Sequence, residues 1–323
     1  MIDFRYHVVS LVSVFLALAV GIVLGAGPLN EGISTGITDQ VRQLTQEKNQ
    51  LRAERDQALA TADAQDSWAE AVTPALVARQ LGGRAIALVE LPGADSSQVD
   101  AAVDVLQQAG ASVPVQVTVQ DAWTDSAQAS TREQVAGRLS GDLASAPAAD
   151  AGTEVVLAAE LARGLVADDL AQADQPDPGA VAVLTALADA GLVEVEGGTD
   201  GLSGQRATLA LVVGGAPDAD ATDAQTEGSD AAWVAIAAQL DATGAGAVLA
   251  GPPESAADGG PVAALRADAD AAADVSTVDD LDASAGRVNA VLALRQQLSG
   301  EVGHYGTAGS ATALNPPLPA AAP

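Results

Sequence analysis

The stretch "RAIALVELPGADSSQVDAAVDVLQQAGASVPVQVTVQD", residues 84–121, decides the fold. It begins with a short apolar run that ends in a Pro-Gly turn, which is typical of a strand. Asp95 or Ser96 then lies where a helix N-cap belongs, and Gly110 lies where a helix ends. The apolar residues between them share one helical face: Val99, Val103 and Leu106. After Gly110, apolar and polar residues alternate with a period of two, so the stretch predicts a strand, a helix and a second strand.

The same pattern returns later in the chain. A helix end, a glycine and a strand are predicted within 186–197, and a continuous apolar strand within 205–218. A helix and a strand are predicted within each of 230–255 and 261–280, and a last helix within 284–300. Strands that alternate with helices indicate an α/β fold, here a Rossmann-like, mostly parallel sheet with helices on both faces.

Composition and length set the expected domain limits. Residues 81–300 are long enough for one α/β domain, and their Ala-, Asp- and Gly-rich segments 145–154 and 217–230 are predicted to be surface loops. Residues 301–323 contain many prolines and few apolar anchors, so we expect an extended Pro/Ala-rich tail.

The N-terminal segment, residues 1–30, is predicted to be a transmembrane signal-anchor helix. Residues 8–29 form an apolar run without a charge. A helix of this length spans about 33 Å, which matches a hydrocarbon core of about 30 Å. A cleaved signal peptide has a shorter apolar core, although Leu24-Gly25-Ala26-Gly27 is a weak candidate cleavage site. A buried core helix is the third alternative.

The charges around this run predict its orientation. Arg5 precedes the run, and the next basic residue is Arg42, whereas Glu31 and Asp39 lie just after it. Lys and Arg favour the cytoplasmic side, so we expect a cytoplasmic N-terminus. The later part of the chain is then extracytoplasmic, held at the cell membrane by a single span and located in the cell envelope.

Residues 31–80 are predicted to form a coiled-coil stalk. Between residues 37 and 65 the chain is rich in Gln, Glu, Arg, Lys and Ala and has no Gly or Pro. Apolar residues recur at heptad spacing: Ile37, Val41, Leu44, Leu51 and Ala58. Lys48 and Arg55 occupy the core positions between them, which favours two strands, because long charged side chains can reach water there. A homodimer is therefore expected; the alternative is a single amphipathic helix packed on the next domain.

The charge of the chain excludes one class of partner. The formal net charge is −29, and most of it lies after residue 80. A nucleic-acid-binding surface needs clustered Lys and Arg, so we exclude nucleic-acid binding.

Sequence motifs for catalysis are weak. The first strand is followed by Leu91-Pro92-Gly93-Ala94-Asp95, without the glycine pattern of a nucleotide-binding loop, and in "VVGGAPDAD" (212–220) acids follow the two glycines. Gly201-Leu202-Ser203-Gly204 is one residue short of a nucleophile elbow, and the base for such a serine would have to be His304. A loop histidine is more often solvated or hydrogen-bonded. We predict no enzyme, no catalytic residue and no cofactor.

Metal ligands are equally scarce. Soft copper sites use Cys, Met or His, and the chain has no Cys, one Met and two His, His7 and His304. The Asp-rich run that begins at Asp218 resembles a calcium loop, but Asp223 occupies the position that requires glycine. This run and "ADADAAAD" (267–274) are better interpreted as acidic surface, so no metal-binding residue is predicted.

The first 29 residues, "MIDFRYHVVSLVSVFLALAVGIVLGAGPL", and the late "GHYGTAG" (303–309) resemble the actinobacterial copper transporter family, the MctB-like proteins. The order of anchor, coiled coil and α/β domain is similar to that family as well. The resemblance implies a cell-envelope location and a role in copper homeostasis or efflux, and some relatives are implicated in envelope assembly and cell separation beside a second membrane protein. It assigns no site residue.

Two functions therefore remain open. The resemblance implies a copper role, whereas the residues themselves favour a non-enzymatic scaffold that binds a membrane or cell-wall partner through its coiled coil and α/β domain.

Overall fold

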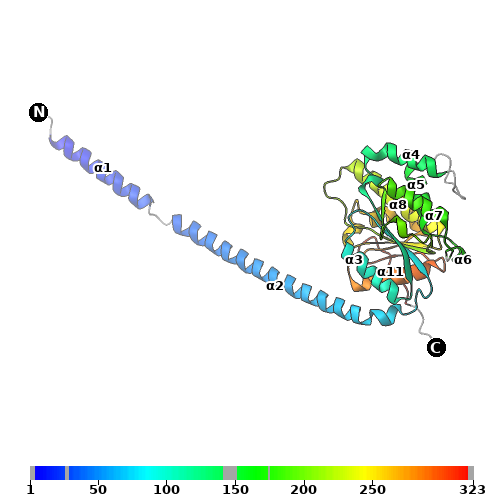
Figure 1. Cartoon of the computed structure of the whole chain (residues 1–323). Coiled ribbons are helices and arrows are strands. Elements are labelled where there is room, and N and C mark those ends of the chain that lie inside the picture. The colour runs from blue at the N-terminus through cyan, green and yellow to red at the C-terminus, as the bar shows by residue number, and fades with distance from the viewer. Residues whose placement is uncertain (1–3, 26–28, 141–150, 174, 319–323) are drawn as a thin grey trace. The chain divides into compact units, whose positions relative to one another are not determined.

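The computed structural model describes residues 4–25, 29–140, 151–173 and 175–318. The chain divides into two compact units, Met1–Gln65 and Asp66–Pro323. Figure 1 shows long helices at the N-terminal end of the chain and a sheet with its covering helices in the second unit.

The first helix, α1 (Phe4–Gly25), is long and apolar enough to cross a membrane. None of its residues is buried in protein, which argues against the alternative of a buried core helix. Two residues of the weak cleavage site, Ala26 and Gly27, lie outside the described residues.

The second helix, α2 (Leu29–Val77), runs through almost the whole segment predicted to be a stalk. Val41, Leu44 and Leu51, three of the predicted core positions, are exposed on the single chain. The helix is therefore confirmed, and the coiled coil stays a prediction.

The end of α2 belongs to the second unit. Thr73 and Val77 are buried there. The two carboxylate oxygens of Asp66 accept hydrogen bonds from the backbone N–H of Ser284, at 2.6 Å, and from its hydroxyl, at 3.1 Å. Ser284 is the first residue of α11 (Ser284–Gln297), so Asp66 satisfies an N–H that has no partner within that helix. The second compact unit therefore includes the last residues of α2, from Asp66 onward, and the domain limits at residues 80 and 300 stay a prediction.

The second unit contains a seven-stranded sheet with the order β3-β2-β1-β4-β5-β6-β7. Among the described strands, β3 alone is antiparallel to its neighbour, so the prediction of a mostly parallel α/β sheet is confirmed. The strands are β1 (Ala85–Glu90), β2 (Ser112–Val119), β3 (Val193–Val195), β4 (Leu209–Val213), β5 (Ala247–Ala250), β6 (Ser276–Val278) and β7 (His304–Tyr305).

Helices cover both faces of this sheet because each buried strand is apolar on both sides. In β1, Ile86 and Leu88 enter one core and Ala87 and Val89 the other. The first core contains α3 and α11, and the second contains α4, α5, α7 and α8 (Figure 1). The helices not yet given are α3 (Ser96–Gln108), α4 (Ala129–Leu139), α5 (Thr153–Leu165), α6 (Leu170–Ala173), α7 (Pro178–Asp189), α8 (Asp223–Thr243), α9 (Pro261–Ala267) and α10 (Ala269–Asp274).

The local signals in residues 84–121 are confirmed. Asp95 is the N-cap of α3 and its carboxylate accepts a hydrogen bond from the backbone N–H of Ser97 at 2.8 Å. Gly110 follows the helix with φ +87°, a conformation that favours glycine.

Other local predictions are wrong. The loop predicted over 217–230 gives way to helix α8 at Asp223, because the Thr222 and Gln225 side chains form a capping box at its first turn. One helix and one strand are predicted within 261–280, but the helical part is divided: α9 ends at Ala267, and the carboxylate of Asp268 caps α10. Residues 145–150 of the other predicted loop lie outside the described residues, and Thr153 and Glu154 begin α5.

Part of the predicted tail packs on the sheet. His304 and Tyr305 form the edge strand β7, and Tyr305 makes a further bridge to Ala313. These contacts are made by the main chain, which explains why the composition of residues 301–318 did not indicate them. Residues 319–323 lie outside the described part of the chain.

Candidate functional site

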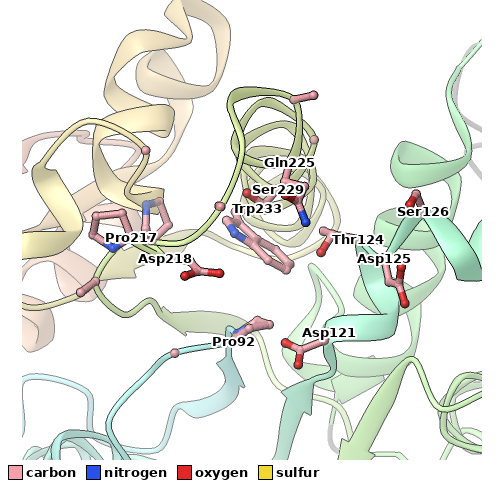
Figure 2. A pocket seen from close by; sticks show the side chains of 17 residues that line it. Pro92, Asp121, Thr124, Asp125, Ser126, Pro217, Asp218, Gln225, Ser229 and Trp233 are labelled. Carbon is pink, nitrogen blue, oxygen red and sulfur yellow. The ribbon is translucent and has the colours of Figure 1, made fainter.

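A pocket of about 800 Å³ opens where β1, β2 and β4 end (Figure 2). Its walls come from the loops after these three strands and from the first turns of α8. We call it the carboxyl-edge pocket. In open parallel sheets, ligands bind at this edge where successive connections leave the sheet in opposite directions, and here β1 lies between β2 and β4.

Two glycine-containing loops, one after β1 and one after β4, lie in close contact at the wall of the pocket. A Cβ atom on Gly215, after β4, would overlap the carbonyl oxygen of Gly93, after β1. A Cβ atom on Gly214 would overlap the Pro261 ring. Only glycine allows these loops to approach so closely. The two loops are far apart in the sequence, and the structure places them side by side.

Among the described residues, the lining of the pocket is acidic and has no basic side chain. The residues that line it include Asp121, Asp125 and Asp218, but neither Lys nor Arg. Asp125 and Asp218 each accept one hydrogen bond within their own loop, from the backbone N–H of Ala127 and of Asp220, both at 2.9 Å. Such a lining repels phosphate, in agreement with the absence of a nucleotide-binding motif.

Trp233 forms the apolar wall of the pocket. It lies on α8 and is 7% exposed. Figure 2 shows its ring directed into the space between Asp121 and Asp218. Trp233, Asp121 and Asp125 were not predicted as site residues. The usable signal was that Asp121 lies two residues after the end of β2, at the edge where the parallel strands end.

A second polar cluster lies inside the domain, around β6. Arg266 and Asp279 form an ion pair of 2.7 Å between side chains that are 4% and 0% exposed. The other oxygen of Asp279 accepts hydrogen bonds from the backbone N–H groups of Thr307 and Ala308, at 2.7 and 3.0 Å. Arg266 also donates to the carbonyl oxygen of Tyr305 at 2.9 Å. We call this group the Asp279 cluster; it attaches the "GHYGTAG" segment to the sheet.

His304 belongs to this cluster and not to a serine hydrolase site. Its Nδ1 lies 3.0 Å from the Thr277 hydroxyl. Burial lowers the pKa of His304, and the nearby Arg266 lowers it further. Ser203 lies in an exposed loop after β3, at the opposite edge of the sheet from His304 in β7, and its hydroxyl accepts a hydrogen bond from the backbone N–H of Gln205 at 3.2 Å.

The neighbouring carboxyl group of Asp280 is buried, and no ion pair between described residues involves it. Burial raises the pKa of Asp280 to about 6, and the nearby Asp279 and Asp282 raise it as well. The Asn289 amide donates to Asp280 at 3.3 Å and to the carbonyl oxygen of Leu314 at 3.1 Å. This contact attaches a second point of the C-terminal segment.

No group of three His, Cys, Asp or Glu side chains in the described part of the chain is close enough to hold a metal ion. The two acidic runs act locally instead, with Asp218 in a turn and Asp268 as a helix cap. The prediction that the chain has no metal-binding residue stays a prediction.

Comparisons with known proteins agree with the resemblance seen in the sequence. The family described as "Copper transport outer membrane protein, MctB" matches residues 1–316. The chain is 32% identical over 311 residues to "Copper transporter MctB" of Mycobacterium tuberculosis and of Mycobacterium bovis, covering 95% of this chain and 96% of each relative. It is 31% identical to the protein of that name from Mycobacterium leprae, over 98% of this chain and all of the relative. The chain therefore belongs to the MctB family of copper transport proteins.

Proposed function

We propose that this protein is a membrane-anchored, non-enzymatic component of copper transport or copper homeostasis in the cell envelope. The observation that carries this proposal is the family match, which extends from the membrane helix to the "GHYGTAG" segment. It favours the copper role over the scaffold that the residue chemistry alone suggested.

The chemistry of the chain indicates an indirect role in handling copper. Cu(I) prefers thiolate, thioether and imidazole ligands, and the chain has no Cys and only Met1, His7 and His304 to offer. His304 is engaged with Thr277 inside the Asp279 cluster. One membrane helix also cannot enclose a pore. Copper would then be bound or moved by a second membrane or cell-wall protein, or by an assembly of several copies.

The proposed organisation follows from the charges and the fold. Residues 1–30 anchor the chain with the N-terminus in the cytoplasm. Lys and Arg favour the cytoplasmic side, and Arg5 lies before the span whereas the next basic residue after it is Arg42. Residues 31–80 form the stalk, 81–300 a Rossmann-like extracytoplasmic domain and 301–323 its tail. We place the span in the cell membrane, whereas the description of the family names the outer membrane.

A homodimer through α2 is the proposed assembly. Leu44 and Leu51 are 63% and 65% exposed and lie at heptad spacing, with Lys48 between them. We expect the detergent-solubilised chain to have the protein mass of two copies by light scattering. Replacing both leucines with glutamate should give one copy, because charges would face each other in the seam. Leu318→Glu, an exposed leucine of the C-terminal segment, is the control; a monomeric wild type would refute the dimer.

The copper role is tested in a deletion strain. Loss of the gene should lower the copper concentration that stops growth, and the full chain should restore it, while zinc tolerance stays unchanged. In parallel, Cu(I) is titrated into the detergent-solubilised full chain. We expect no binding tighter than micromolar, because suitable ligands are missing. Unchanged copper tolerance together with defective cell separation would contradict the proposal and support the scaffold. Tight Cu(I) binding would contradict the indirect role.

A further inference from the structure

We propose that the carboxyl-edge pocket binds a small organic cation, a molecule that carries an ammonium or substituted ammonium group. This inference goes beyond the copper role and does not depend on it, because it is argued from the lining of the pocket alone.

The pocket has the size and place of a ligand site. Its volume of about 800 Å³ lies within the range of about 300–1,000 Å³ that is typical of small-molecule sites. It lies at the strand ends where open α/β sheets bind ligands. Two of the loops that line it approach closely at Gly93 and Gly215, where a Cβ atom on Gly215 would overlap the Gly93 carbonyl oxygen.

The charge of the lining selects the class of ligand. Asp121, Asp125 and Asp218 line the pocket without any basic residue, and no ion pair between described residues involves them. An anionic ligand would meet three carboxylates and no compensating cation. A bare metal ion is also unsuitable, because three carboxylates do not come close enough together in the described structure. An extended cation can reach separate carboxylates one at a time.

Trp233 favours an organic cation over an inorganic one. Indole is the best aromatic partner for a cation, and a substituted ammonium group has apolar carbons that can pack against the ring. The ring is directed into the space between Asp121 and Asp218 (Figure 2). The hydroxyl groups of Thr124 and Ser229 also line the pocket and can accept hydrogen bonds from ammonium N–H groups.

One position in the wall allows a clean blocking variant. Gly228 lies in α8, lines the pocket, and has open space where a Cβ atom would stand. A phenylalanine there would fill part of the pocket without a clash at its Cβ. Gly137 in α4 is also exposed and helical with open space at Cβ, and it does not line the pocket, so Gly137→Phe is the matched control.

The test is calorimetric titration of the detergent-solubilised full chain at physiological salt. The probes are putrescine and tetramethylammonium, with trehalose as a neutral probe and citrate as an anionic one. We expect one site per chain for at least one of the cations and no binding of trehalose or citrate. Gly228→Phe should abolish binding, and Gly137→Phe should leave it unchanged. Asp218→Asn, which keeps the shape of the side chain, should weaken binding about ten-fold, the size of one lost charged hydrogen bond.

Three results would overturn the proposal. The first is no saturable binding of either cation by the wild-type chain. The second is cation binding that persists in Gly228→Phe, which would reveal general attraction to the acidic surface. The third is trehalose or citrate binding as tight as that of the cations. Thermal unfolding of each variant checks that the fold is retained, and Asp218→Asn supplies an independent answer should Gly228→Phe unfold.

Discussion

Replacing Asp279 with alanine will lower the free energy of unfolding of the detergent-solubilised chain by about 3–5 kcal/mol, the usual result of removing one partner of a buried ion pair. Asp279 is fully buried and Arg266 nearly so. Without the carboxylate, the guanidinium would stay buried and uncompensated, and the backbone N–H groups of Thr307 and Ala308 would lose their acceptor. A near-ultraviolet circular dichroism melt measures the effect.

The site at which a protease first cuts the Asp279→Ala chain tests the role of the Asp279 cluster. Because Asp279 attaches residues 303–310 to the sheet, limited proteolysis of Asp279→Ala should cut this segment first. Replacing Asp279 with leucine and Arg266 with methionine together should cost less than Asp279→Ala alone, because no buried charge is then left without a partner.

The matched control is an exposed ion pair. Arg42 and Asp39 lie 3.0 Å apart with both side chains 72% exposed. Asp39→Ala should leave the melting temperature unchanged, because solvent screens such pairs. If the Asp279→Ala chain has the same melting temperature as the wild type, the Asp279 cluster does not stabilise the domain.

Two acidic residues in the middle of α1, introduced as Val14→Asp and Leu18→Asp, will remove the chain from the membrane. Each carboxylate adds about 2.5–3.5 kcal/mol to the free energy of inserting a helix at the bilayer centre. Acidic residues contribute little to the choice of orientation, so the change tests insertion itself. Membrane and soluble fractions of the cells are compared by immunoblot.

The same chains also test the orientation of the span. The protein has no cysteine, so Gln107→Cys, at an exposed position of α3, provides a single thiol. A membrane-impermeant maleimide should label it in intact cells when α1 is unchanged and fail to label it when α1 carries both aspartates. Val14→Leu with Leu18→Val is the control. Labelling only after lysis of otherwise unchanged cells would reverse the proposed orientation, and density separation of the envelope shows which membrane holds the chain.

The sequence allowed prediction of those elements whose signals are local. The apolar run of α1, the capped helix α3 with Asp95 and Gly110, and the fully apolar β4 each need only neighbouring residues to be recognised. The alternation of strands and helices predicted a mostly parallel sheet. A helix between two strands returns the chain to the end of the sheet where the first strand began, so the next strand runs parallel to it. Where local signals conflicted, as in the Asp- and Gly-rich start of α8, prediction failed, because two side chains of the capping box outweighed composition.

What the sequence by itself determined is the order of anchor, long helix and α/β domain, the shortage of soft metal ligands and the family. Tertiary structure alone decided which distant residues meet. Asp66 meets Ser284, Arg266 meets Asp279, and Asp121 lies in one pocket with Asp218 and Trp233. These pairs are separated by 13 to 218 residues along the chain and follow no repeat. Their contacts form because the buried sheet brings strand ends and loops together, and burial of a charge then requires a partner at that place.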